Sequence, residues 1–136
     1  MKSYTDIEQS KKLAEILPIE SADACWTNHL FNAFLSTMRI ESTSPQEYKN
    51  LLDGFAVRGY LIEPAWSLAA LLSMIDTVKE ILYHRVTMLV GKYAGNNWYI
   101  ELEKIQDERS ALLVYSKELI DACYEMIVKL HEQKLL

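Results

Sequence analysis

The chain has few glycines and no glycine-rich loop. It contains 4 glycines in 136 residues, and none of them stands in a G-x-G-x-x-G, a G-x-x-x-x-G-K-[ST] or a G-x-S-x-G pattern. The first two patterns cradle phosphates with backbone N–H groups, and the third presents a nucleophilic serine at a tight turn. The sequence therefore offers neither a phosphate-binding loop nor a hydrolase elbow.

Cysteine and histidine are also scarce, and their spacing suits no metal site. Cys25 and Cys123 stand in opposite halves of the chain, and neither belongs to a C-x-x-C pair. His29, His84 and His131 form no H-x-H or H-E-x-x-H motif, the spacings that bring two imidazoles onto one metal. We therefore expect two free thiols, as in a reducing cytoplasm, and neither a metal nor a cofactor.

Positive charge and long apolar runs are lacking as well. The 14 Lys and Arg are outnumbered by 19 Asp and Glu, giving a net charge of −5, so we expect no nucleic-acid partner. The longest uncharged apolar run, 65–75, is shorter than the roughly 20 residues that cross a bilayer. The charged start MKSYTDIEQSKK has no signal-peptide core. These features predict a soluble cytoplasmic protein of one domain, 1–136, without a membrane partner.

Helix signals occur at both ends and in the centre of the chain. Thr5 and Glu8 fit a capping box that starts a helix, and Pro18 ends it. Pro64 is predicted to open a central helix that is apolar almost all round and therefore buried. Leu119–Lys134 predicts a C-terminal amphipathic helix with a continuous apolar stripe, made of Leu119, Ala122, Cys123, Met126, Ile127 and Leu130.

This last helix carries a cysteine, two glutamates and a histidine within fourteen residues, IDACYEMIVKLHEQ. On a helix, Glu125 lies about 160° round the axis from Cys123, and His131 lies roughly 12 Å further along it. One ligand atom cannot touch all three side chains. The cluster therefore predicts an ordinary amphipathic helix, with Cys123 in the apolar stripe, and not a catalytic or metal site.

The segment 77–115 fits two interpretations. As a hairpin, Arg85–Tyr93 and Trp98–Ile105 are strands, because the second alternates apolar and polar residues, and Ala111–Tyr115 is a third strand. As a helix, the segment offers apolar residues three and four apart, such as Val86, Leu89 and Tyr93. The strict alternation and the Gly-Asn-Asn turn favour the hairpin.

The segment between the first and central helices mixes signals. Ser21–Trp26 is interpreted as a short strand, Asn28–Arg39 as a helix and Glu41–Ser44 as a polar loop. Ser44–Gly54 starts with a cap and a proline, as a helix does, and Phe55–Ile62 suggests a short extended piece.

Together these elements predict an α+β fold. A small antiparallel sheet, with a hairpin at about 85–105 and a third strand at about 111–115, packs against the buried central helix and the C-terminal amphipathic helix. An all-α bundle is the alternative.

Tyr99, Glu101 and Glu103 form the candidate interaction surface, because they share one face of the predicted second strand. The two carboxylates, roughly 6.5–7 Å apart along that strand, also suit paired-carboxylate catalysis with His84 nearby. Exposed carboxylates are commonplace on alternating strands, so we assign no catalytic residue.

Three blocks resemble a family of small uncharacterised proteins of gut anaerobic bacteria and their phages and mobile elements. They are DIEQSKKLAEILPIESAD (Asp6–Asp23), PAWSLAALL (Pro64–Leu72) and LIDACYEMIVKLHEQKLL (Leu119–Leu136), in that order, and they cover less than half of the chain. The resemblance implies short alternating strands between the central and last helices. It carries over no activity, cofactor or catalytic residue.

Without a catalytic constellation, the sequence predicts a non-enzymatic accessory or regulatory protein of a mobile element or phage, which binds an unknown protein partner. An edge strand or an exposed aromatic residue such as Tyr99 would supply the surface. One alternative is a homo-oligomeric structural, immunity or inhibitor module that acts through self-association. The other is a cryptic enzyme that uses Glu101 and Glu103.

Overall fold

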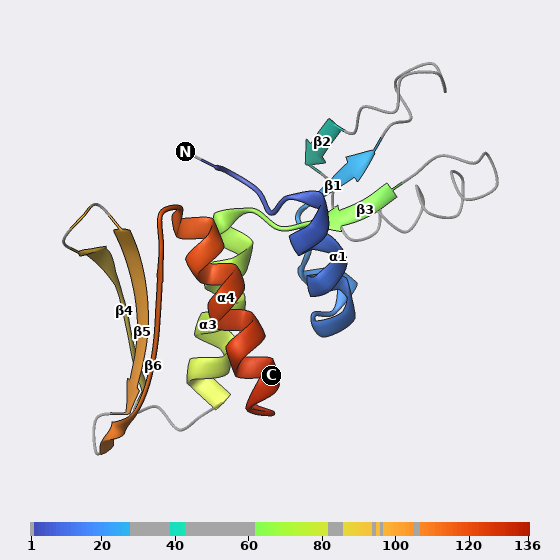
Figure 1. Ribbon diagram of the computed structural model, residues 1–136. Coiled ribbons are helices and arrows are strands. Elements are labelled where there is room, and N and C mark those ends of the chain that lie inside the picture. Colours follow the sequence, from blue (N-terminus) through green and yellow to red (C-terminus); the bar gives the residue numbers. More distant parts are fainter. Residues whose placement is uncertain are drawn as a thin grey trace. The chain divides into compact units, whose positions relative to one another are not determined.

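The fold is α+β, as the sequence predicts, and not an all-α bundle. The computed structural model describes residues 2–27, 39–42, 62–81, 86–93, 95, 97–104 and 107–136. These ranges contain α-helices and two antiparallel sheets, with strand orders β2-β1-β3 and β4-β5-β6 (Figure 1).

The chain divides into two compact units, which are described one at a time. The smaller unit is Tyr4–Ala70, and the larger unit combines Met1–Ser3 with Leu71–Leu136. The chain therefore leaves the larger unit after Ser3 and returns to it inside a helix. Unfolding experiments test whether the units behave as the single domain that the sequence predicts.

The first helix, α1 (Ile7–Ile16), is capped one residue later than the sequence predicts. Asp6 is the N-cap, and its carboxylate accepts the Gln9 N–H at 2.9 Å while the Gln9 side chain accepts the Asp6 N–H at 3.1 Å. The predicted Thr5–Glu8 capping box is therefore wrong, because Thr5 is buried and used elsewhere. The predicted end is confirmed, since Leu17, just before Pro18, is extended.

The small sheet places β1 (Ala24–Thr27) between β2 (Arg39–Ser42) and β3 (Ile62–Ala65). The strand predicted at 21–26 is thus confirmed in its second half, and Ile19–Ser21 forms a 3-10 turn. Arg39–Ser42 pairs with β1, so the predicted loop is wrong at 41–42 and the predicted helix is wrong at 39. Residues 28–38 and 43–61 lie outside the described residues, and with them the rest of the predictions for this segment.

The central helix, α3 (Leu68–Ile81), begins four residues after the predicted Pro64. Pro64 pairs with Cys25 as part of β3, an outer strand of the described sheet, where a residue without an N–H is tolerated. The helix is instead capped by Ser67, whose Oγ accepts the Ala70 N–H at 3.2 Å. Asp23 holds Ser67 in place by accepting its N–H at 2.8 Å and its hydroxyl proton.

The two ends of the smaller unit meet in an isolated antiparallel bridge between Tyr4 and Ser67. Beside it, the Thr5 N–H donates to the Trp66 carbonyl at 3.0 Å, and the Trp66 N–H donates to Thr5 Oγ1 at 3.1 Å. Both residues are fully buried. The segment entering this unit and the segment leaving it are thereby fastened together.

The larger unit confirms the predicted hairpin and third strand. β4 (Val86–Tyr93) pairs with β5 (Asn97–Lys104), which pairs with β6 (Asp107–Ser116), all antiparallel. Gly95 has a φ of 86° in the turn between β4 and β5, a conformation that favours glycine. The third strand extends beyond the predicted 111–115 at both ends.

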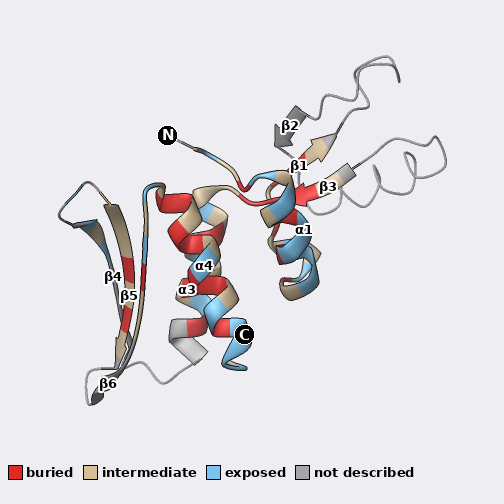
Figure 2. Cartoon of the chain, in the orientation of Figure 1, coloured by how far each residue is buried: buried red, intermediate tan, exposed pale blue. Residues whose placement is uncertain are grey.

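The C-terminal helix, α4 (Leu119–Glu132), packs against β5 and β6. Its buried residues match the predicted stripe, with Ile120 in addition, and the sheet contributes buried Ile100, Leu102 and Val114 (Figure 2). Lys2 ties the start of the chain to this helix, because its Nζ lies 2.8 Å from the Asp121 carboxylate. The core of this unit therefore lies between one face of the sheet and its helices, which leaves the other face to be considered.

Candidate interaction surface

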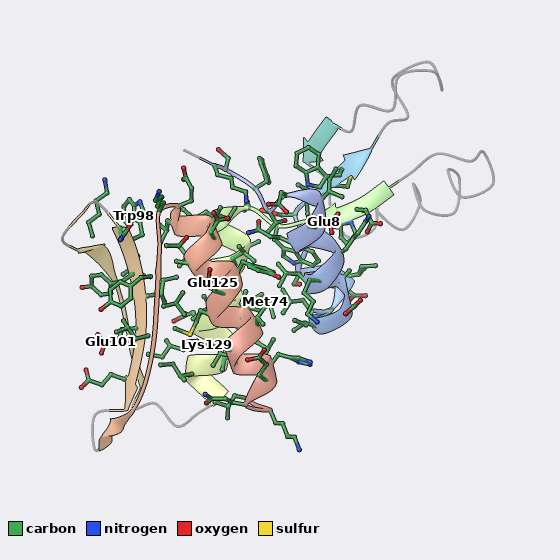
Figure 3. The ribbon with its side chains drawn as sticks, in the orientation of Figure 1. Glu8, Met74, Trp98, Glu101, Glu125 and Lys129 are labelled. Atoms are coloured by element: carbon green, nitrogen blue, oxygen red, sulfur yellow. The ribbon has the colours of Figure 1, made fainter. Side chains whose placement is uncertain are left out.

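The candidate residues Tyr99, Glu101 and Glu103 lie together on β5, the middle strand of the larger sheet. They alternate along the strand with Ile100 and Leu102, which point toward the helices and are 0% and 4% exposed. Figure 3 shows Glu101 projecting from the sheet on the side away from α4. The prediction that these three residues share one face agrees with this strand register.

We call this side of the sheet the outer face. Cross-strand pairs share a face, and the register pairs Tyr99 with Tyr115 and Glu101 with Leu113. The described side chains of the outer face are therefore Asn97, Tyr99, Glu101, Glu103, Leu113 and Tyr115. Val90, which with Tyr115 makes up the exposed large apolar residues of the described part of the chain, pairs with Ile100 and so belongs to the opposite face.

The Tyr99 ring is held in place from two sides. A Cβ added to Gly91, its partner on β4, would come within 2.9 Å of Tyr99 Cε1, so the ring lies directly over that glycine. On β6, the Tyr115 ring centroid lies 6.4 Å away, with the two planes tilted by 52°. This is a favourable aromatic geometry, and it fixes a π surface on the sheet.

Sequence reasoning missed Tyr115, the most exposed large apolar side chain of the outer face at 46%. Its alternation with Val114 in the predicted third strand was a usable signal. This alternation does not predict that Tyr115 lies opposite Tyr99. The register of the two strands depends on the turn between them and on the β-bulge between Leu102 and Lys104.

Glu101 and Glu103 are partly exposed and add negative charge to the outer face. Among the side chains that the structure describes, neither glutamate forms an ion pair. Two of the described lysines make other contacts. Lys92 Nζ lies 4.9 Å from the Trp98 ring centroid, and Lys129 Nζ donates to the Leu113 carbonyl at 3.0 Å.

The cysteine, glutamates and histidine of the C-terminal helix do not form a site. Cys123 is fully buried and Glu125 is exposed, as the helical spacing predicts, and His131 is exposed as well. Burial raises the pKa of the Cys123 thiol from 9.0 to about 12, which keeps it protonated and unreactive at neutral pH. His84 lies outside the described residues.

The buried polar cluster of the smaller unit is a second place to look for chemistry. Thr5 Oγ1 lies 2.8 Å from Ser10 Oγ, and the Trp66 indole donates to Ser21 Oγ at 2.9 Å. No buried side-chain nitrogen or oxygen of the described residues lacks a hydrogen-bond partner. These groups hold the fold together and leave no polar atom aimed at a ligand.

Within the described ranges, no three His, Cys, Asp or Glu side chains are grouped so as to hold a metal ion. The helices found there also include none that is long and apolar enough to cross a membrane. Comparison of the chain with protein-family models, curated proteins and solved structures finds no match. The family resemblance therefore stays a prediction, and function must be argued from the outer face.

Proposed function

We propose that the chain is a non-enzymatic interaction protein, an accessory or regulatory product of a mobile element or phage, that binds another protein through the outer face. The observation that carries the proposal is the aromatic pair: Tyr115, 46% exposed, beside Tyr99 on the side of the sheet away from α4. Tyrosine is enriched at protein interfaces because a rigid apolar ring and a polar hydroxyl bind at little entropic cost.

The disposition of the carboxylates favours binding over catalysis. Paired-carboxylate enzymes place their two groups on opposite sides of the bond they act on. Glu101 and Glu103 instead project from the same face of one strand, and both are partly exposed. Such groups suit the polar rim that surrounds the apolar centre of an interface.

The test is a tagged pull-down from host lysate, with and without nuclease, on three forms of the chain: the wild type, Tyr115→Ala and Val90→Ala. The two variants each truncate an exposed apolar side chain, but on opposite faces of the sheet. We expect one protein in near-equal amount, insensitive to nuclease, retained by Val90→Ala and lost from Tyr115→Ala.

Other outcomes reject the proposal. Recovery that vanishes with nuclease indicates a nucleic-acid complex. Recovery of the chain alone, with a light-scattering mass of more than one copy, indicates self-association. A partner retained equally by both variants places the interface elsewhere on the molecule.

A further inference from the structure

We propose that the outer face recognises an extended, arginine-bearing segment of its partner, with a guanidinium stacked on the Tyr99 ring beside Tyr115 and paired with the neighbouring glutamates. This inference rests on the proposed function and names the chemical class that the surface accepts.

Among the described side chains of the outer face, the charged ones are all negative. Glu101 and Glu103 carry two negative charges, and no described cation pairs with either of them. Lys92 pairs with Trp98, which lies between Asn97 and Tyr99 on β5 and therefore points to the opposite face. Lys92 covers the Trp98 ring there. A partner that covers these two carboxylates, which no described cation neutralises, must supply positive charge, since desolvating them without a cation is unfavourable.

The aromatic pair selects arginine over lysine. Gly91 and Tyr115 fix the Tyr99 ring, so a flat π surface stands ready next to Glu101. A guanidinium stacks on an aromatic ring and at the same time donates two parallel hydrogen bonds to a carboxylate. The compact and more strongly hydrated lysine ammonium does this less well.

The spacing selects an extended segment. Tyr99, Glu101 and Glu103 follow each other at every second residue of β5, which is roughly 6.5–7 Å per step. Alternate side chains of an extended peptide repeat at the same distance. An Arg-x-Arg sequence lying along β5 therefore brings one guanidinium to each glutamate.

The test uses an acetylated Gly-Arg-Val-Arg-Val-Arg-Gly amide peptide, titrated into the intact ¹⁵N-labelled chain and followed by backbone amide shifts. We expect shifts centred on residues 99–103 and 113–115. Replacing arginine with lysine should weaken binding several-fold, and replacing it with neutral citrulline should abolish it. Binding should also weaken as salt is raised.

Two matched double variants separate the site from overall charge. Glu101→Gln with Glu103→Gln should weaken binding about tenfold, since each exposed ion pair contributes a modest amount. Glu8→Gln with Glu125→Gln removes the same charge from exposed helix positions and should leave affinity unchanged (Figure 3). Circular dichroism checks that both variants are folded.

Three results overturn the inference: shifts that map elsewhere, equal binding of the citrulline peptide, or equal loss in both double variants. The failure of the proposed function has a different signature. If Glu101→Gln with Glu103→Gln captures as much of the lysate partner as the wild type does, the protein-binding function stands and the arginine inference falls. If the peptide binds as expected but no partner is captured, the inference stands and the function falls.

Discussion

Thr5 shows how one hydroxyl fixes the interior of the smaller unit. Its Oγ1 accepts the buried Trp66 N–H at 3.1 Å and lies 2.8 Å from Ser10 Oγ, and all three residues are fully buried. Valine has nearly the same shape as threonine but cannot make either bond. The cost of that exchange measures the value of the hydroxyl, because a buried polar group left unpaired is expensive.

We expect Thr5→Val to lower the free energy of unfolding by about 1–3 kcal/mol, because it leaves the Trp66 N–H and the Ser10 hydroxyl without that partner. Thr77→Val is the control, since Thr77 is exposed and donates only to the Ser73 carbonyl at 2.9 Å. It should change stability by less than about 0.5 kcal/mol. Urea unfolding measures both, and equal effects would contradict this account of Thr5.

Burial of Cys123 should make the free energy of unfolding decrease as pH rises above 9. In the folded chain burial raises its pKa from 9.0 to about 12, so the unfolded thiol ionises first as pH rises. Its stabilising contribution is complete below pH 9 and falls by about 1.4 kcal/mol per pH unit up to about pH 12.

The measurement compares urea unfolding of the wild type and of Cys123→Ala at pH 8 and pH 10. Alanine does not titrate, so the free energy of unfolding of the wild type should fall more between the two pH values, by roughly 1 kcal/mol. Other titrating groups are common to both proteins and cancel. Parallel losses would show that the thiol is not protected from ionisation.

At the scale of elements, the β4–β5 hairpin positions the candidate site through its two glycines. Gly91 lies under the Tyr99 ring, whereas Gly95 has open space around it and a φ of 86°. A side chain at position 91 would collide with the Tyr99 ring, whereas a side chain at position 95 would be strained by the positive φ of the backbone. Alanine at each position therefore has a different consequence.

Gly91→Ala should displace the Tyr99 ring and weaken its contact with Tyr115. The free energy of unfolding should change by less than about 1 kcal/mol, because the far end of a tyrosine can move aside and alanine restricts the unfolded chain. Gly95→Ala should cost about 1–2 kcal/mol and leave the rings in place. Ring-to-ring nuclear Overhauser effects and urea unfolding read out the two effects. Intact ring contacts in Gly91→Ala would refute the close approach.

Elements specified by their own pattern were predictable from the sequence. The alternation around Ile100 and Leu102, together with the Gly-Asn-Asn turn, favoured the hairpin over a helix and indicated the face that carries Tyr99. The apolar stripe sufficed for α4. Both patterns persist over several turns or residues. A periodic pattern therefore predicts an element without knowledge of its partners most securely where a single period fits, as in α4.

Elements decided by distant partners were not predictable. Thr5 has the spacing of a cap, but its oxygen is taken by Trp66, 61 residues away, and so Asp6 caps α1 instead. Pro64 resembles a helix start until its pairing with Cys25 is known. Likewise, the contact between Tyr99 and Tyr115 depends on the register of β5 and β6, which the local sequence of neither strand determines.

At the scale of the whole molecule, α3 is shared by both compact units. Its first residues, up to Ala70, belong to the smaller unit, and from Leu71 onward it contributes buried Leu71, Ile75 and Val78 to the larger one. Helix formation is cooperative along the chain. We therefore expect the units to unfold together, as a single domain does.

5-Fluorotryptophan NMR in urea tests this, because Trp98 reports on the larger unit and Trp26 and Trp66 on the smaller. All three signals should lose native intensity at one urea concentration. Ser73→Gly, at an exposed position of α3 in the larger unit, should lower all three midpoints equally, with a cost of about 0.5 kcal/mol. Midpoints that differ between the units would show independent domains.

The Tyr4–Ser67 bridge has a consequence for the response of the chain to mechanical tension. A force that enters the smaller unit at Tyr4 and leaves it at Ser67 passes through the bridge. The roughly 60 residues between these two positions carry no load while the bridge holds. Because the bridge is antiparallel, this force peels its hydrogen bonds apart one after another and does not shear them together. The unit should therefore yield at low force, in one step that releases about 200 Å of extended chain.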